Sequence, residues 1–183
     1  TNYSKESEWI LLHILDTNSS WFHSNKQYIL EQSQVNDFID CINKRKDHIP
    51  LQLILGLATF YGRDFILFPD VFIPRVETEQ IIEILGNSHF NNALDICSGS
   101  GVLAITLFLE GSASSVDAID ISNTCIENIT ENINYFDCSN SVKTYELDIL
   151  NQKPDKKFDL IVCNPPYIKS NDTNLLPHDV KHY

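Results

Sequence analysis

The second half of the chain alternates short apolar runs with helical segments that end at glycines. The apolar runs predict four buried strands, at residues 93–97, 116–121, 142–147 and 158–163. The segments between them predict helices, one ended by Gly111 and the next capped by Ser122. Parallel strands must be joined by long crossovers, which are usually helices, so this alternation predicts a parallel sheet. The expected fold class is therefore α/β, with a Rossmann-like, doubly wound sheet.

The first 76 residues follow other patterns. Residues 1–47 are predicted to be helical, because an apolar stripe with helical spacing runs through Val35, Phe38, Ile39 and Ile42. Shorter helices are predicted at residues 9–14 and 28–30. Farther along, glycines and prolines separate short apolar pieces, which predicts a hairpin or an extended connector. The chain thus divides into three predicted parts: a small helical domain at 1–47, a connector with a hairpin at 48–76, and an α/β domain at 77–183.

Composition excludes several classes of function. Lys and Arg total 13 against 25 Asp and Glu, and the net charge of −12 repels phosphate backbones. Direct binding of nucleic acid is therefore not expected. The five cysteines are odd in number and form no Cys-x-x-Cys, so neither a disulfide framework nor a metal site is predicted. No apolar run approaches a membrane span and no signal peptide is recognised, which predicts a cytoplasmic protein without a membrane partner.

The first motif that carries chemistry is a glycine-containing turn between a predicted strand and a helix. It comprises Asp95, Cys97, Ser98, Gly99, Ser100 and Gly101. Glycines let the backbone approach a ligand closely, and the helix that follows offers free N–H groups. Nineteen residues after the turn, Asp120 ends the second predicted strand, where a carboxylate can accept both hydroxyls of a ribose. The spacing fits a dinucleotide site as well, and an ordinary tight turn is a third interpretation.

Two details favour S-adenosylmethionine over a nicotinamide cofactor. Asp95 precedes the glycines at the end of the first predicted strand, which resembles the arrangement in methyltransferases of this fold, and Asp148 and Ile149 follow the third strand. An acidic side chain there can meet the adenine amine, and Ile149 can cover the ring. A helix cap or a solvated loop carboxylate is an equally good interpretation of Asp148. Together these residues predict a cofactor site to which Asn164 also contributes.

The second motif is Asn164-Pro165-Pro166-Tyr167, which directly follows the fourth predicted strand. Two consecutive prolines fix φ and remove two N–H donors, so the carbonyls there are rigid and exposed. Asn164 adds a side-chain acceptor and Tyr167 a flat aromatic face. This set suits a planar NH₂ group, whose hydrogens two acceptors can hold. A plain strand terminator is the alternative. Together the two motifs resemble the amino-group methyltransferases, which modify adenine, cytosine, guanine or glutamine nitrogen.

A third set of residues resembles one family in particular. It comprises residues 50–56, Phe60-Tyr61-Gly62 and residues 72–79. They are similar to the release-factor glutamine N5-methyltransferases, although Val76 replaces a usual proline and Cys97 a usual glycine. The likeness extends over nearly the whole chain. Members of that family have further strands, so the resemblance predicts that the methyltransferase domain is incomplete here.

The resemblance implies an activity and roles for individual residues. The chain would transfer a methyl group from S-adenosylmethionine to the Gly-Gly-Gln glutamine of class 1 peptide chain release factors. Asn164 and the Pro165 carbonyl would accept the amide hydrogens, and Pro166 and Tyr167 would complete the catalytic motif. Phe72 and Arg75 would bind the substrate from the other side, with Tyr167 packed on the amide plane. The helical domain would dock the release factor.

Two rival functions stay open on sequence grounds. The Asn-Pro-Pro-Tyr motif also occurs in adenine-N6 methyltransferases of DNA and in guanine methyltransferases of ribosomal RNA. The acidic charge and the lack of a target-recognition region argue against both. The other rival is a catalytically inactive module that uses the helical domain to hold a partner.

Overall fold

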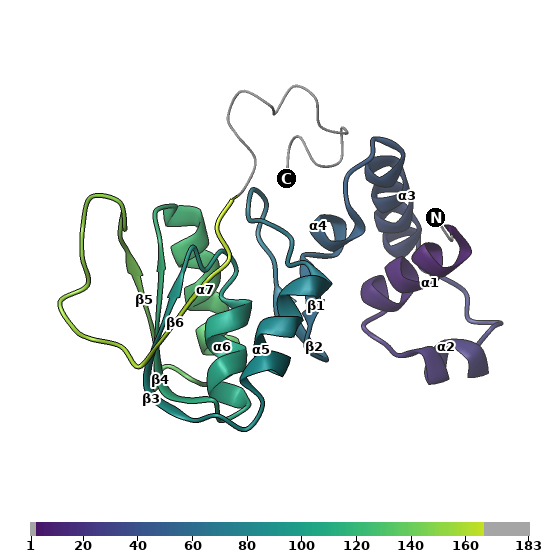
Figure 1. Ribbon diagram of the computed structural model, residues 1–183. Coiled ribbons are helices and arrows are strands. Elements are labelled where there is room, and N and C mark those ends of the chain that lie inside the picture. The colour runs from purple at the N-terminus through teal and green to yellow at the C-terminus, as the bar shows by residue number, and fades with distance from the viewer. Residues whose placement is uncertain (1–2, 167–183) are drawn as a thin grey trace. The chain divides into compact units, whose positions relative to one another are not determined.

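A computed structural model describes residues 3–166 (Figure 1), and the chain divides into two compact units at residues 55 and 56. The first unit is helical throughout. It comprises α1 (Tyr3–Ile14), α2 (Ser19–Ser24), α3 (Gln32–Lys46) and α4 (Leu51–Leu55). Helices α1 and α3 pack against each other, and Ile10 of α1 is completely buried.

The middle helix of this unit lies earlier in the chain than the sequence predicts. Residues 28–30 form no helix, so the helix expected there is wrong. Helix α2 begins after Asn18 instead, whose side-chain Oδ1 accepts a hydrogen bond from the Trp21 N–H at 3.0 Å. An asparagine in this position satisfies an N–H that the first helical turn leaves unpaired. The cap therefore decides where this short helix starts.

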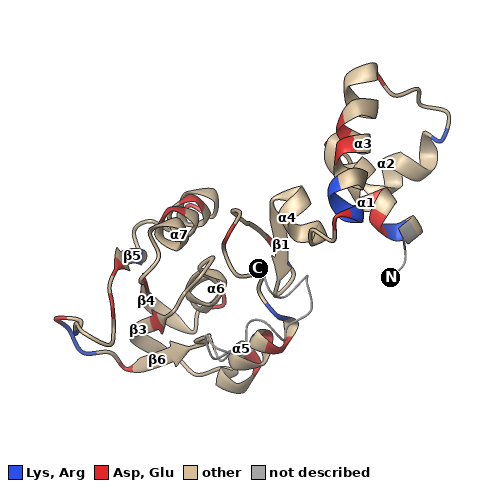
Figure 2. Cartoon of the chain, turned by 90° about the horizontal axis from the view of Figure 1, so that it is seen from above, with Lys and Arg blue, Asp and Glu red and all other residues tan. Residues whose placement is uncertain are grey.

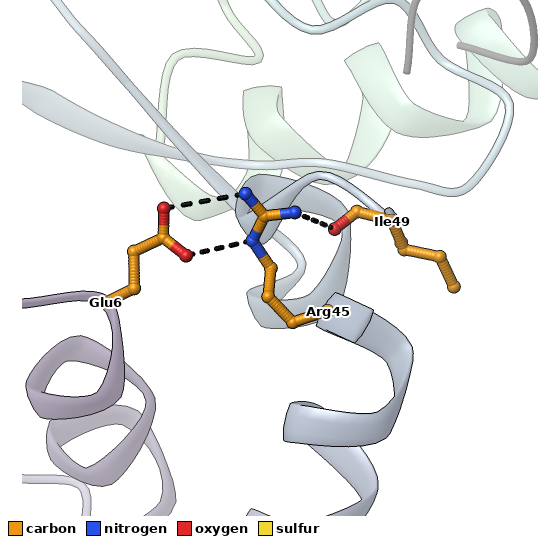
Figure 3. A network of polar contacts seen from close by, with 3 residues as sticks. All are labelled: Glu6, Arg45 and Ile49. Atoms are coloured by element: carbon orange, nitrogen blue, oxygen red, sulfur yellow. Dashed lines mark hydrogen bonds and ion pairs between the residues drawn. The ribbon is translucent and has the colours of Figure 1, made fainter. Parts of the chain in front are cut away.

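An ion pair ties the helices of the first unit together (Figure 3). The Arg45 Nε donates to Glu6 Oε2 at 2.9 Å, which joins α3 to α1. The Arg45 Nη1 donates to the Ile49 carbonyl at 3.2 Å, just before α4. A guanidinium can serve a carboxylate and a carbonyl together because its donors are fixed in one plane. Arg45 thereby fixes the chain's path from α3 toward α4.

The second unit opens with the expected hairpin, β1 (Leu57–Phe60) and β2 (Arg63–Ile66). Tyr61 and Gly62 form its two-residue turn, and both have positive φ, 48° and 72°. Positive φ at both central residues matches the right-handed twist of the flanking strands. Phe60 and Phe65 are fully buried in the core of this unit, and the Phe65 ring lies 4.7 Å from that of Phe136.

The remaining strands form one parallel sheet in the order β5-β4-β3-β6. They are β3 (Phe90–Ile96), β4 (Ala113–Asp120), β5 (Val142–Glu146) and β6 (Leu160–Cys163). A 3₁₀ turn (Val76–Thr78) leads into α5 (Glu79–Leu85), and α6 (Val102–Leu109) and α7 (Asn123–Tyr135) are the crossovers. Figure 1 shows these three helices on the same side of the sheet. The α/β fold class with a parallel sheet is confirmed.

The strand order places a crevice at the carboxyl edge of the sheet. The chain runs outward from β3 to β4 and β5, and then returns to the other side of β3 as β6. Ile96, the last residue of β3, pairs with Ile119 on one side and with Cys163 on the other. Ligands of open α/β sheets bind where the strand order reverses in this way. Both predicted motifs begin at this point.

The acidic composition is found in both units of the structure. In each unit the acidic positions outnumber the basic ones (Figure 2). Among residues 3–166, no helix combines the length and the apolar character needed to cross a bilayer.

Candidate functional site

A cavity of about 380 Å³ opens at the carboxyl edge of the sheet, within the second unit. Its size falls in the range of small-molecule sites, which begins at about 300 Å³. Two groups of residues line it. The donor side is defined here as Asp95, Cys97, Ser98, Gly99, Ser100 and Asp120, and the acceptor side as Phe72, Arg75, Thr78, Asn164, Pro165 and Pro166. The structure thus brings together most of the predicted site residues.

Asp95 is the completely buried residue of the donor side. Its carboxylate is completely buried, and its Oδ2 accepts a hydrogen bond from the Ala104 N–H in the first turn of α6 at 3.2 Å. Its Oδ1 has no hydrogen-bond partner among the described residues. Burial disfavours the charged form and raises the pKa of Asp95 to about 7. A cation in the cavity would stabilise the carboxylate and supply the missing partner.

The turn after β3 is held in left-handed backbone conformations. Cys97, Gly99 and Gly101 have φ of 59°, 57° and 80°. Cys97 adopts this conformation with a side chain, and burial raises its pKa to about 11, so it lines the cavity as a neutral thiol. Gly101 does not line the cavity. A Cβ there would lie 3.1 Å from Ile129 Cγ2 of α7, so this glycine serves close packing of the loop against α7.

Asp120 joins the end of β4 to the loop after β3. Its Oδ2 accepts from the Gly99 N–H at 3.0 Å, and its Oδ1 accepts from the Ser122 N–H at 3.0 Å. Each carboxylate oxygen has a second lone pair, so two further donors can bind. Asp120 therefore both fixes the donor loop and presents acceptors to the cavity.

The acceptor side combines two segments that are far apart in the sequence. Asn164 Nδ2 donates to Thr78 Oγ1 at 3.1 Å, across 86 residues. The Arg75 guanidinium lies over the Phe72 ring, 5.3 Å from its centroid, and the Phe72 side chain is half-exposed. Exposed Pro165 and Pro166 complete the lining. Tyr167, the last residue of the predicted motif, lies outside the described residues.

The structure does not bring Asp148 and Ile149 to the cavity lining. The Asp148 carboxylate accepts from the Leu150 N–H at 3.0 Å and from Asn151 Nδ2 at 2.7 Å. These contacts match the loop-carboxylate interpretation of Asp148. The predicted adenine contacts of both residues stay a prediction.

Several lining residues were not predicted. They are Asp70, Pro74, Thr78, Val102, Leu103, Ile121, Ser122 and Cys125. Ile121 could have been predicted from the sequence, because it directly follows the strand-end carboxylate of Asp120. In the structure this large apolar side chain is 65% exposed. Thr78 belongs to the segment 72–79 that carries the family resemblance, but no sequence pattern assigned it a role, since a threonine before a helix is normally interpreted as a cap.

The residues present fit S-adenosylmethionine, the group that the first motif predicts. The unpartnered Oδ1 of Asp95 suits an ammonium, and the remaining lone pairs of Asp120 suit ribose hydroxyls. Ile121 supplies an exposed apolar face for an aromatic base. No group of three or more metal-ligating side chains is arranged to hold a metal ion within residues 3–166.

Comparisons with known proteins agree with this fit. The family model "Methyltransferase small domain" matches residues 76–178, and "PrmC N-terminal domain" matches residues 2–56. Release factor glutamine methyltransferase of Bacillus cereus is 35% identical over 96% of this chain and 65% of its own length. The Clostridium botulinum protein of that name is 29% identical over 100% of the chain and 66% of its own length. The Mycoplasma mycoides one is 34% identical over 91% and 61%.

These matches confirm the resemblance to release-factor glutamine methyltransferases. The chain spans about two thirds or less of the length of these three relatives. A methyltransferase domain implies S-adenosylmethionine as the methyl donor, which confirms the predicted cofactor. The first model covers more than half of the chain, and the chain therefore belongs to the methyltransferase small domain family.

Proposed function

We propose that this chain transfers a methyl group from S-adenosylmethionine to the side-chain amide nitrogen of a glutamine. The substrate would be the Gly-Gly-Gln motif of class 1 release factors. One observation carries the chemistry: Asn164 and Pro165 line the same cavity as the loop after β3 and Asp120. The names of the relatives support the substrate.

On the donor side, each lining residue would have a distinct role. Asp120 would accept from the ribose hydroxyls, Asp95 would face the ammonium, and Ile121 would cover the adenine. The backbone of residues 97–100, before the N-terminus of α6, would meet the carboxylate. S-adenosylmethionine supplies a methyl group made electrophilic by its sulfonium.

On the acceptor side, hydrogen-bond acceptors would activate a poor nucleophile. An amide nitrogen loses conjugation and gains positive charge as it bonds to the methyl group. Acceptors on its hydrogens then bind the transition state better than the ground state. Asn164 Oδ1 and the Pro165 carbonyl would be these acceptors, since both residues line the cavity. Two hydrogen bonds to a developing charge, at about 1.5–3 kcal/mol each, correspond to roughly 10²- to 10⁴-fold in rate.

The other residues of the acceptor side would orient the amide. Phe72, with Arg75 over its ring, lines the cavity and would present an apolar face to the amide. Tyr167 is proposed to pack on the opposite face of the amide, and Pro166 to keep the motif rigid. No general base is required at the start, since the extra proton can leave after transfer.

The helical unit is proposed to dock the release factor, which would place the reaction in the cytoplasm. The three-part division at residues 47 and 76 belongs to the same proposal. Under it, the connector carries Phe72 and Arg75 to the cavity. Direct contact with nucleic acid is not part of the proposal, because the net charge is −12.

The experiment is transfer from methyl-labelled donor to a class 1 release factor, followed by mapping of the labelled residue. The expected result is a single label on the Gly-Gly-Gln glutamine. A factor with that glutamine replaced by alanine serves as the blank. Equal labelling of the blank would show that the substrate residue is wrong. Labelled DNA or ribosomal RNA would favour the rival methyltransferases, and failure to bind the donor in calorimetry would favour an inactive binding module.

A further inference from the structure

We infer that Thr78 is a positioning residue, which turns the Asn164 amide so that its Oδ1 faces the reacting nitrogen. This inference rests on the proposed function. Thr78 lies at the end of the segment that carries Phe72 and Arg75, and its hydroxyl contacts the side chain of the residue that begins the Asn-Pro-Pro motif.

The placement of Thr78 is unusual for a threonine before a helix. It occupies the cap position of α5, yet its side chain makes no capping hydrogen bond. Its Oγ1 accepts instead from Asn164 Nδ2 at 3.1 Å. The Thr78 residue is 9% exposed, so its hydroxyl has little access to water. The hydroxyl is therefore used for a contact across the cavity wall rather than for the helix.

The contact matters because an asparagine amide has two chemically opposite ends. With Nδ2 committed to Thr78, Oδ1 is the end left to accept a hydrogen from the substrate. A flipped amide would present N–H groups to the NH₂ of the glutamine, where two sets of donors repel each other. Pro165 and Pro166 have no N–H, so their backbone cannot compete as donors for the Asn164 oxygen. The hydrogen bond from Asn164 Nδ2 to Thr78 Oγ1 thereby holds the amide in the productive orientation.

The test uses the whole protein and three threonine variants. Thr78→Val keeps the shape and removes the acceptor, and Thr78→Ser restores it. Thr144→Val is the matched control, because its buried Oγ1 on β5 has no hydrogen-bond partner within the described residues. In single-turnover transfer to a release factor, Thr78→Val should be slower by about fivefold, equivalent to about 1 kcal/mol. Thr78→Ser should recover most of that loss, Thr144→Val should match the parent, and donor affinity should stay unchanged in all three.

A double-mutant cycle separates positioning from a general effect on structure. If Thr78 acts through Asn164, Thr78→Val should change the rate by less than about twofold once Asn164 is alanine. The same fivefold loss in both backgrounds would overturn the inference, as would equal losses in the Val and Ser variants.

A second measurement does not depend on the substrate. The side-chain NH₂ of Asn164, followed by nuclear magnetic resonance, should be protected from exchange in the parent and in Thr78→Ser and lose that protection in Thr78→Val. Unchanged protection in Thr78→Val would overturn the inference. If the parent labels no release factor, the proposed function fails, while this measurement still decides the role of Thr78.

Discussion

The two sides of the cavity are built in different ways. The donor side is mostly backbone and buried carboxylate: Asp95 is completely buried and bonded to α6, and Asp120 accepts two backbone N–H groups. The acceptor side is exposed at Asn164 and Phe72, and a side-chain hydrogen bond to Thr78 connects its two segments. The donor side is thus held by the sheet and its crossover helices, and the acceptor side by contacts between distant segments.

This difference implies that the two sides can be disabled separately. Donor-side changes should lower affinity for S-adenosylmethionine. Acceptor-side changes should leave donor binding intact and slow the transfer step.

The largest effect is expected from Asn164→Ala. It removes one acceptor from the amide NH₂, so single-turnover transfer should fall by roughly two orders of magnitude, while donor affinity stays within about threefold. Asn164→Asp keeps an acceptor of similar shape and should retain more activity than the alanine variant. Exposed Asn140, far along the chain from the motif, is the matched control for replacing an asparagine. Transfer at the parent rate in Asn164→Ala would refute the mechanism.

The next largest effect is expected from Asp120→Ala. The ribose hydroxyls lose a charged acceptor, and the Gly99 N–H loses its partner in the loop. Donor affinity in calorimetry should fall by roughly 10- to 100-fold, equivalent to about 1.5–3 kcal/mol. Asp148→Ala is the matched control, since that carboxylate bonds its own loop and does not line the cavity. An equal loss in Asp148→Ala would instead assign the adenine contact predicted from the sequence.

A smaller effect is expected from pH, through Asp95. Its pKa is raised to about 7 by burial, so the folded apoprotein keeps the proton well above the ordinary value of 3.8. A cationic donor favours the carboxylate, so affinity should rise by roughly fivefold between pH 6 and pH 7.5. Asp95→Asn should abolish this dependence. A parent affinity that is constant over this range would show that Asp95 does not face the donor's charge.

The raised pKa of Asp95 also makes stability depend on pH. Donor affinity should rise with pH, whereas the Asp95 contribution to the free energy of unfolding should fall. Between about pH 4 and pH 7 the unfolded chain has lost the Asp95 proton and the folded chain retains it. The Asp95 contribution to the free energy of unfolding therefore decreases as pH rises through this window. Comparison of urea unfolding of the parent and of Asp95→Asn across the window isolates this contribution.

The smallest effects are expected from the two loop glycines. Both have positive φ, so alanine costs about 1 kcal/mol of conformational energy at either position. At Gly101 the new Cβ also lies 3.1 Å from Ile129 Cγ2, whereas at Gly99 nothing lies within 4 Å. Gly101→Ala should lower the free energy of unfolding more than Gly99→Ala does. Equal losses in urea titrations would contradict the packing role given to Gly101.

The donor side could be predicted from the sequence because it is local. A strand, a glycine turn and a helix follow one another within residues 90–109, and the end of the next strand supplies Asp120. The parallel sheet could be predicted as well, because the alternation of apolar runs and helical segments is also a local pattern. The prediction of a helix at 28–30 was wrong because the helix of this region begins earlier in the chain, after Asn18, where the apolar pattern is weak.

The acceptor side could be predicted only in part. The Asn-Pro-Pro motif could be recognised because its residues are consecutive in the sequence. Phe72 and Arg75 were predicted to bind the substrate only through the family resemblance. The contact between Thr78 and Asn164 depends on how β6 aligns with β3 and on where α5 starts, which no local pattern encodes. Asp148 does not line the cavity, and its carboxylate accepts hydrogen bonds within its own loop, which spacing along the chain does not reveal.

The most direct test of the two-sided cavity is a crystal structure with S-adenosylhomocysteine and a peptide containing Gly-Gly-Gln. We expect the ribose hydroxyls within hydrogen-bond distance of Asp120, and the glutamine NH₂ about 3 Å from Asn164 Oδ1 and from the Pro165 carbonyl. The sulfur should then face the glutamine nitrogen between the two sides. An adenosine bound away from Asp120, or a glutamine amide that contacts Asn164 through Nδ2, would contradict the account.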